Sequence, residues 1–311
     1  ADGKWLYDDW KLAIENITSD NVTCDINFST ISKINLSDYI ISLAGTTQGT
    51  GQVVDENGYR YEGKNPNNYI WFNNEFWRII GVFDESSHGQ SGKNLVKIIR
   101  ADILDGRSRH CRTMNSWVGS TLHSLLNGAY YNAEDGTNSR NCIGYCTSYQ
   151  ASTGTNCDYT VRGIQSNIRE MVASVKWYSG QVSDRGATAD LFYESERAKV
   201  LDSTSYIGLM YASDYGYSVL ASSCARTTGL NAYNSAECAG QSWLYGKGRE
   251  WTITSYASDS KYAFFLNTGG QGDIMYTSYG YGSRPVLYLD ASVYKIDGDG
   301  SLNSPYIIGM Q

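Results

Sequence analysis

The spacing of apolar residues near the start of the chain is that of two short helices. Apolar side chains recur at every third or fourth position over residues 4–17 and again over residues 36–43, where Asn35 or Ser37 can cap the helix. Residues 22–28, between them, alternate between apolar and polar and predict a strand. The first part of the chain is therefore expected to be a small, mainly helical segment.

From residue 59 onward the pattern is mostly that of β-strands. The segment YIWFNNEFWRIIGVF contains two apolar runs separated by Asn73 and Asn74, and asparagine tolerates the positive φ that a tight turn demands, so a β-hairpin is predicted. Residues 96–100 predict the next strand. Helical spacing returns in residues 116–127, 163–177 and 194–201. The rest of the chain predicts five strands, which read IGLMYAS, EWTITSY, AFFLNT, DIMYTS and RPVLYLD.

This order of elements favours an α+β fold in which the first and last strands close a sheet. The Gly/Thr/Gln-rich residues 45–52 predict a flexible connection before it. We expect residues 1–56 to form an N-terminal helical attachment segment, and residues 57–311 to form one domain with a cysteine-containing insertion near residues 132–160. The N-terminal segment is the expected point of attachment to an anchor or a filament.

Charge and hydropathy exclude two classes of partner. The chain has a net charge of −7 and no run of Lys and Arg, whereas a nucleic-acid-binding surface needs a clustered basic face. Its longest apolar runs, residues 69–72 and 79–82, are far too short to span a bilayer. We therefore expect no nucleic acid and no direct membrane insertion in this chain.

Candidate catalytic and metal-binding groups are sparse. The three histidines, His88, His110 and His123, lie in unrelated contexts and no catalytic motif appears, so neither catalysis nor a cofactor is expected. The turn that contains Asp297 and Asp299 imitates the start of a calcium-binding loop but lacks the final glutamate of such a loop. A Gly-rich turn is the preferred interpretation, and no metal is expected.

The seven cysteines bear on the compartment in which the protein works. Together with a surface rich in Asn, Ser, Thr and Tyr, they are typical of an exported protein. In an oxidising compartment we expect Cys224 to pair with Cys238, and Cys24 is the candidate free thiol. Two more bridges are expected among the other four cysteines, which are Cys111, Cys142, Cys146 and Cys157. A zinc site at the CIGYC segment is the competing interpretation, although no second pair lies at zinc-finger spacing.

A tyrosine-rich segment is the strongest indication of function. Fifteen of the 29 residues from 255 to 283 are Tyr, Ser or Gly, and only Asp259, Lys261 and Asp273 are charged there. Tyrosine supplies a large, stiff contact area, and Ser and Gly supply adaptable hydrogen bonding, as in an antibody combining site. The segment therefore predicts a binding surface. A tyrosine-rich sheet with solvated turns is the alternative, because Tyr is also a preferred strand residue.

Several segments carry a family likeness. The order WFNNEFWRIIGVF, LVKIIRADIL, IGLMYASDYGYS, EWTIT and finally GSRPVLYL resembles a set of bacterial surface proteins whose last segment looks like the C-type lectin fold. It is also similar to the variable proteins that diversity-generating retroelements diversify, whose lectin-like domain ends in a related Arg-Pro strand after a stretch rich in Tyr, Asn, Ser and Asp. The likeness covers about residues 57–290. It implies a C-type-lectin-like fold with long loops and inserted helices.

The resemblance also implies a division between framework and displayed residues. Arg284, a framework residue, is expected to hydrogen-bond carbonyls of neighbouring loops. Because the side chains of a strand alternate, inward-facing Ala263 and Phe265 would leave Tyr262 and Phe264 exposed, as an apolar patch of the kind that partner sites show. The implied framework positions are Trp71, Trp77, Trp243, Trp251, Ala263, Phe265, Arg284 and Leu287.

The chain departs from two groups that share the lectin-like fold. It lacks the Glu-Pro-Asn, Gln-Pro-Asp and Trp-Asn-Asp motifs of calcium-dependent sugar-binding lectins, so calcium-dependent sugar binding is not expected. It has no cysteine after Cys238, whereas formylglycine-generating enzymes use a reactive cysteine pair near their C-terminal end.

The expected function is that of an extracellular or cell-surface ligand-binding protein, adhesin- or receptor-like, whose ligand is a protein or a cell-surface glycan. The alternative is a structural subunit of a pilus or surface layer, in which the same face packs against a neighbouring copy. The candidate contact residues are Tyr256, Asp259, Tyr262, Phe264, Asn267, Asp273, Tyr276, Tyr279 and Tyr281. Asn231, Tyr233 and Asn234, on the loop between Cys224 and Cys238, are candidates for a rim of this surface. An ordinary solvated loop is the slightly preferred interpretation of these three residues.

Overall fold

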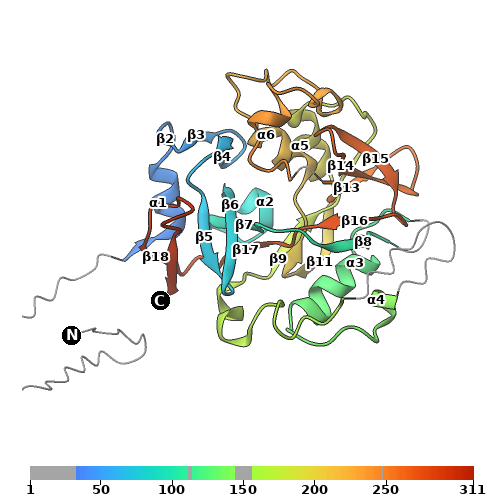
Figure 1. Ribbon diagram of the computed structural model, residues 1–311, viewed down its shortest axis with the longest axis horizontal. Coiled ribbons are helices and arrows are strands. Elements are labelled where there is room, and N and C mark those ends of the chain that lie inside the picture. The colour runs from blue at the N-terminus through green and yellow to red at the C-terminus, as the bar shows by residue number, and fades with distance from the viewer. Residues whose placement is uncertain (1–32, 111–113, 144–155, 247) are drawn as a thin grey trace, which may run out of the picture. The chain divides into compact units, whose positions relative to one another are not determined.

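The computed structural model describes residues 33–110, 114–143, 156–246 and 248–311. Residues 33–311 form one unit, whose elements are shown in Figure 1. The helix predicted at residues 4–17, the strand predicted at 22–28 and Cys24 lie outside the described residues. The unit includes residues 33–56, which the sequence analysis assigned to the attachment segment.

The largest sheet has eight strands and is antiparallel throughout. Its order is β12-β17-β7-β6-β4-β3-β2, and β5 pairs with β6. These strands are β2 (Thr47–Gln48), β3 (Thr50–Asp55), β4 (Tyr59–Asn65), β5 (Tyr69–Phe72), β6 (Glu75–Phe83), β7 (Leu95–Arg100), β12 (Ile207–Gly208) and β17 (Val286–Tyr288). Because β17 near the end of the chain pairs with the early strand β7, the expected closing of a sheet by early and late strands is confirmed.

Two turns in this sheet show what the sequence analysis predicted correctly and what it did not. Asn73 and Asn74 have φ values of 57° and 59°, as both central residues of a tight hairpin turn require, so the hairpin of β5 and β6 is confirmed. Residues 45–52 were expected to be a flexible connection, but they form a second hairpin, since β2 pairs with the start of β3. Gly49 makes this turn with a φ of 58°.

The second sheet has six strands and carries the tyrosine-rich segment. Its order is β15-β14-β13-β16-β8, and β10 pairs with β13. The pairs of β13 with β10 and with β16 are parallel, and the others are antiparallel. These strands are β8 (Leu104–Ser108), β10 (Gln181–Val182), β13 (Glu250–Tyr256), β14 (Tyr262–Leu266), β15 (Gly272–Tyr276) and β16 (Gly280–Ser283).

The two sheets are joined where the chain passes between them twice. The chain first passes from the large sheet to the second sheet, from β7 into β8. It later returns from β16 into β17. These two passages lie side by side, because β7 pairs with β17 and β8 pairs with β16. Arg284, between β16 and β17, is buried, and it donates from Nη2 to the carbonyl oxygen of Leu244 at 2.7 Å. The predicted bond to a loop carbonyl is thus confirmed. An ion pair that was not predicted, with Glu250 at 2.7 Å, adds to it.

Two short sheets complete the strand inventory of the described residues. One has three strands, in the order β1-β18-β19, and the other pairs β11 with β9. These strands are β1 (Ile34–Asn35), β9 (Val175–Tyr178), β11 (Val200–Ser205), β18 (Val293–Asp297) and β19 (Ile307–Met310).

A buried helix, α6 (Ala212–Ser218), contacts strands of both large sheets, β4 and β13. All its residues are buried, and α5 (Ala189–Arg197) packs beside it. The sequence analysis predicted a strand through this region, which is correct only for β12. The chain turns into a helix because the Asp214 carboxylate accepts the backbone N–H of Tyr211 at 2.9 Å and so caps the first turn.

The remaining helices correct two predictions. Residues 163–177 were predicted to be one helix, but they contain only a 3₁₀ turn, Ser166–Met171, followed by β9. The helix predicted at 194–201 is α5, which begins and ends earlier. The predicted helix at 36–43 is confirmed, and the side chain of Asn35 caps it by accepting the N–H of Ser37. The helix that Asn35 caps is α1 (Leu36–Ser42). The other helices are α2 (Glu85–His88), α3 (Thr121–Leu125) with the π-helical turn Leu126–Tyr130, and α4 (Arg140–Ile143).

The described residues therefore form a mixed fold of helix and sheet in which sheet predominates. Seven of the eight implied framework residues are buried. The exception is Trp71, which is 40 % exposed and places its ring edge-on against Phe76 of the neighbouring strand.

Candidate binding surface

Three tyrosines of the second sheet and of the turn after β15 form one partly exposed cluster, which we call the tyrosine surface: Tyr262, Tyr276 and Tyr279. Tyr262 of β14 and Tyr276 of β15 are paired across the hairpin, and their ring centroids lie 4.3 Å apart. Tyr279 follows in the next turn, 6.4 Å from Tyr276, with the two rings nearly parallel at 18°. Tyr276 is 42 % exposed, and the other two are half-buried. The rings therefore offer one continuous, partly solvated aromatic face.

The tyrosine surface contains no Asp, Glu, Lys or Arg side chain. A hydrogen bond to Tyr276 is the main cause that raises the pKa of Tyr262 to about 12. Met114, which is 49 % exposed, lies close to the strand that carries Tyr276, because its carbonyl oxygen accepts the hydroxyl of Thr277. A partner would therefore meet flat, polarisable groups with hydroxyl tips, which suit recognition more than acid–base chemistry.

Three candidate contact residues are buried, so their expected exposure is wrong. Phe264 is 1 % exposed, because α5 covers that face of β14 and its Phe192 ring meets Phe264 edge-on at 4.9 Å. The other face of β14 is buried too, as was predicted for Ala263 and Phe265. Tyr281 packs 4.7 Å from the ring of Phe265.

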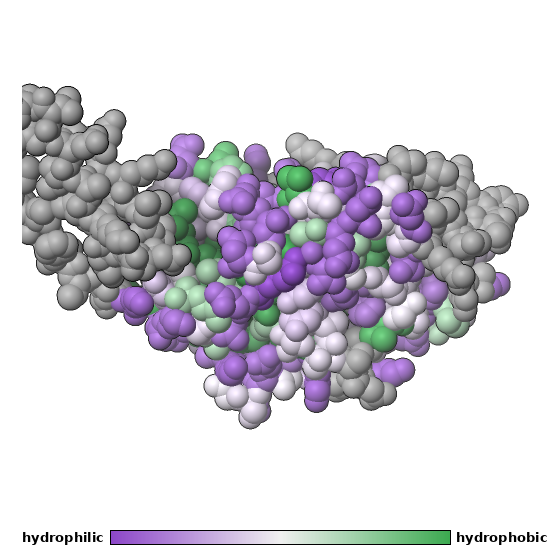
Figure 2. Space-filling view, turned by 90° about the horizontal axis from the view of Figure 1, so that it is seen from below, coloured by the Kyte–Doolittle hydropathy of each residue, from purple (hydrophilic) through white to green (hydrophobic). Residues whose placement is uncertain are grey.

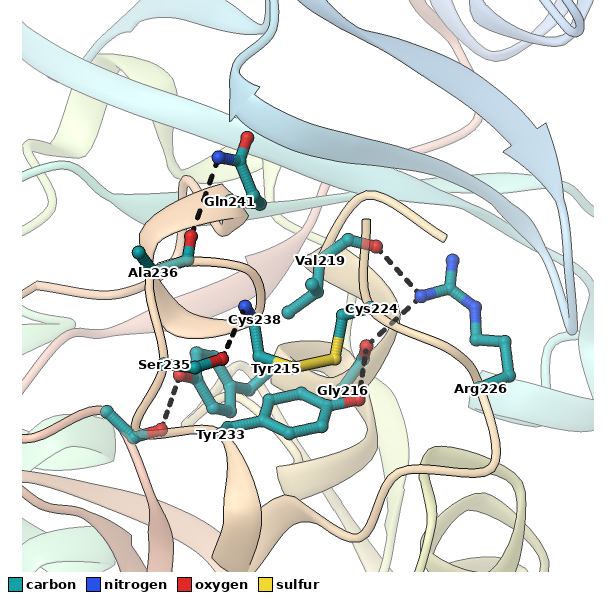
Figure 3. Close-up of a disulfide and its surroundings, with 11 residues drawn as sticks. Tyr215, Gly216, Val219, Cys224, Arg226, Tyr233, Ser235, Ala236, Cys238 and Gln241 are labelled. Carbon is teal, nitrogen blue, oxygen red and sulfur yellow. Dashed lines mark hydrogen bonds between the residues drawn. A yellow bond between two sulfur atoms is a disulfide. The ribbon is translucent and has the colours of Figure 1, made fainter. Parts of the chain in front are cut away.

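Tyr233, the third, lies beneath a disulfide. Its ring centroid is 5.6 Å from that of Tyr215, and its hydroxyl donates to the carbonyl oxygen of Gly216. Figure 3 shows these residues beside the bridge between Cys224 and Cys238, the pairing that was predicted. Tyr233 is therefore part of the core of this loop and not of its rim.

Four of the remaining candidates, Asp259, Asn267, Asp273 and Tyr256, have structural partners. Asp259 accepts the N–H of Lys261, and Asn267 accepts the N–H groups of Gly269 and Gln271, so both shape turns. The side chain of Asp273 is paired with that of Arg185. Tyr256 is half-buried against Phe264. Asn231 and Asn234 are exposed. The binding role of these positions stays a prediction.

The β14–β15 turn is tied both to α6 and to the loop closed by Cys224 and Cys238, and it lies at the opposite end of the hairpin from the tyrosine surface. Tyr215 donates its hydroxyl to the carbonyl oxygen of Gly270, at 2.5 Å, and Gln271 donates to the carbonyl oxygen of Asn231. Gly270 has a φ of 88°, and a Cβ there would lie 2.3 Å from the Cβ of Ala239. This turn is thus held by contacts that only glycine allows.

Two buried polar residues that the sequence analysis missed hold the other end of the hairpin. Asn115 donates from Nδ2 to the carbonyl oxygens of Tyr256 and Tyr262, at 2.7 and 2.8 Å. Arg109, fully buried, donates to the carbonyl oxygens of Asn115 and Ile253, each at 2.6 Å. Together they fix the loop from which Tyr262 projects. No local sequence signal identifies them, because all their acceptors except the Asn115 carbonyl lie more than 100 positions along the chain.

The structure also bears on the other chemistry considered above. His88 and His123 lie on different helices, and burial lowers the pKa of each. Asp297 and Asp299 accept nearby backbone N–H groups within a turn, at 2.7 and 2.9 Å. Within the described part of the chain no three His, Cys, Asp or Glu side chains are grouped as metal ligands.

Two disulfides lie among the described residues. Besides Cys224–Cys238, Cys142 pairs with Cys157, as one of the bridges expected in the insertion. Cys111 and Cys146 lie outside the described residues. None of the helices in the described ranges is both long and apolar enough to cross a membrane. The two bridges fit a secreted or extracellular protein.

On the face shown in Figure 2, polar residues predominate, and apolar residues lie in small separate patches. In comparisons with known proteins, no protein-family model, no curated protein and no solved structure matches the chain. The function must therefore be argued from the residues and their geometry.

Proposed function

We propose that this protein is an extracellular ligand-binding protein, adhesin- or receptor-like, with a C-type-lectin-like domain that presents the tyrosine surface to a protein or a cell-surface glycan. The observation that carries the proposal is an exposed aromatic cluster on a hairpin held at both ends. Binding to a pre-organised surface loses little conformational entropy, and aromatic side chains dominate the energy of many interfaces.

The alternative role, a subunit of a pilus or surface layer, uses the same three rings for contact with a neighbouring copy. Both roles predict that the tyrosine surface is essential, but they differ in the partner. A chain that remains monomeric at high concentration and binds an immobilised glycan or surface protein supports the receptor role. Filaments that grow with protein concentration support the structural role.

The test is a double variant, Tyr276→Ala with Tyr279→Ala, assayed on a glycan array and by sedimentation over a range of concentrations. Each lost aromatic contact of a binding centre weakens binding by about tenfold or more. The matched control is Tyr131→Ala with Tyr206→Ala, since these two tyrosines also stack, with centroids 4.1 Å apart, outside the second sheet. Unchanged binding and unchanged sedimentation in the first variant, with wild-type folding, would refute both roles.

The resemblance to retroelement-diversified proteins gives this proposal a further part, that displayed positions between residues 231 and 283 vary while the framework stays constant. Asn231, Asn234 and Tyr276 are exposed, whereas Trp251 and Phe265 are buried, so the proposed separation is physically possible here. Sequences of the same locus from sibling strains decide it. Differences confined to the exposed positions support diversification, and even drift along the chain excludes it.

A further inference from the structure

A cluster of buried charges lies around α6, away from the tyrosine surface. Asp214 of α6 accepts Nζ of Lys97 at 2.5 Å and Nη1 of Arg60 at 2.9 Å, and all three side chains are buried. Burial lowers the pKa of Lys97 to about 8. Although burial acts to raise the pKa of Asp214, the two cations hold it below its ordinary value. One carboxylate thus serves two cations.

The second carboxylate of the cluster, that of Glu196 at the end of α5, is hydrogen-bonded to hydroxyl groups. It accepts the hydroxyls of Ser213 and Thr254, both at 2.5 Å. Burial raises its pKa. The nearest nitrogen of Arg197 is 3.9 Å from its Oε2, which is beyond hydrogen-bond distance. Glu196 therefore does not satisfy the neighbouring guanidinium.

The guanidinium of Arg197 is consequently without an acceptor. Its Nε, Nη1 and Nη2 are all buried, and none has a hydrogen-bond partner within the described part of the chain. The group lies 3.6 Å from the ring centroid of Tyr193 and 5.2 Å from that of Tyr211. Rings contact the face of a guanidinium, whereas its five N–H bonds point outward in its plane, so these contacts leave the donors unused.

Other unused donors lie around the same rings. Nη2 of Arg60 and the hydroxyl of Tyr288 are buried and also lack partners among the described residues. Arg60 shares the ring of Tyr193 with Arg197, at 5.7 Å, and Lys97 lies over Tyr211 and Tyr288, at 4.5 and 5.7 Å. The cations Arg60, Lys97 and Arg197 outnumber the carboxylates Asp214 and Glu196 by three to two.

We propose that this cluster binds a small monovalent inorganic anion, such as chloride, with the guanidinium of Arg197 as its main ligand and Arg60 Nη2 and the Tyr288 hydroxyl as further donors. Buried N–H donors without an acceptor destabilise a fold, and the carboxylate nearest to Arg197, that of Glu196, is too far away to accept from it. An anion would supply the missing acceptor and balance the remaining positive charge. A monovalent ion matches the excess of one positive charge. The site is independent of the tyrosine surface and of the proposed receptor role.

The test compares thermal unfolding of the whole chain in sodium chloride and in sodium gluconate at equal ionic strength. Since a ligand of the native state stabilises it by mass action, we expect the Tm to rise with chloride and to approach saturation. Arg197→Met should lose this rise. Arg185→Met, which removes an exposed arginine, should keep it.

A second measurement does not depend on the folding of a variant. Crystals of the wild-type protein grown with bromide should show an anomalous peak at the guanidinium of Arg197. Equal Tm values in the two salts, or a water molecule alone at that position, would overturn the proposal. A bromide peak without any anion effect in solution would mean an adventitious ion only and would overturn it as well.

Discussion

Asp214 is a buried residue that connects several parts of the interior. It caps α6, and it neutralises Lys97 of β7 and Arg60 of β4, so one side chain connects a helix to the largest sheet. Charges of this kind are stable inside a protein only while each partner is present. Removing the Asp214 carboxylate would therefore lower the stability of the fold mainly by leaving Lys97 and Arg60 buried without a counter-charge.

Asp214→Asn should destabilise the fold by about 3–5 kcal/mol, since it leaves two buried cations without their counter-charge. Urea denaturation at neutral pH measures the change. Asp273→Asn makes the same chemical change in the exposed pair with Arg185 and should change the unfolding free energy by less than about 1 kcal/mol. Similar effects in the two variants would contradict the assigned role of Asp214.

At the scale of elements, the β14–β15 hairpin shows how a display surface is fixed. Its turn is tied to α6 through Tyr215 and to the disulfide loop through Gln271, and its open end is tied to Asn115. The sequence analysis placed β13, β14 and β15 correctly, because their apolar runs are local. It assigned the wrong exposure to Phe264, because the covering ring of Phe192 comes from a helix more than 60 residues earlier.

Asn115→Ala should loosen the loop of residues 256–262 without unfolding the sheet. The substitution removes the donor to the carbonyl oxygens of Tyr256 and Tyr262. Loss of a buried hydrogen bond costs about 1–3 kcal/mol, so the amides of this loop should exchange roughly tenfold faster or more. Hydrogen–deuterium exchange with mass spectrometry resolves the segment.

The matched control is Asn127→Ala, because Asn127 makes equivalent bonds to the backbone of Tyr206 and Ile207. Its effect should appear near residues 206–207 and leave 256–262 unchanged. Uniformly faster exchange in both variants would show that Asn115 acts on global stability and does not position the loop.

Across the whole molecule, many tyrosines belong to the core. The chain has 26 tyrosines, and many of them, including Tyr61, Tyr215 and Tyr288, are buried in different parts of the fold. Burial raises the pKa of each of these three. A tyrosine-rich composition therefore does not by itself mark a binding surface. The tyrosine surface is distinguished by three neighbouring rings that include Tyr276, the one tyrosine of the described residues that is exposed.

These buried hydroxyls predict an alkaline limit of stability. A group whose pKa is raised on folding stabilises the native state fully at pH values below the pKa that the group has in the unfolded chain, which is about 10 for tyrosine. This stabilisation is lost as the pH rises above that pKa toward the higher pKa of the folded state. Lys97 acts in the opposite sense, because its lowered pKa makes stability rise between about pH 8 and about 10.4. We expect the free energy of unfolding to fall steeply only above about pH 10.

Urea denaturation at a series of pH values, with tyrosinate absorbance recorded for both states, tests this expectation. Each buried tyrosine should contribute a slope of about 1.4 kcal/mol per pH unit above its unfolded pKa. Tyr288→Phe removes one such group and should make the decline shallower. A decline that begins near pH 8 would rule out the tyrosines as its cause.

By itself, the sequence determined the local parts of this protein. The Asn73–Asn74 turn, the Asn35 cap and the main strands follow from contacts within a few residues, and the two cysteines of the 224–238 loop are also close in sequence. Only the tertiary structure decided which tyrosines are exposed, how Asn115 holds the hairpin, and how β4, β7, α5 and α6 bring their charges together. The physical reason is that burial and buried charge depend on neighbours that are distant in sequence, which no local pattern records.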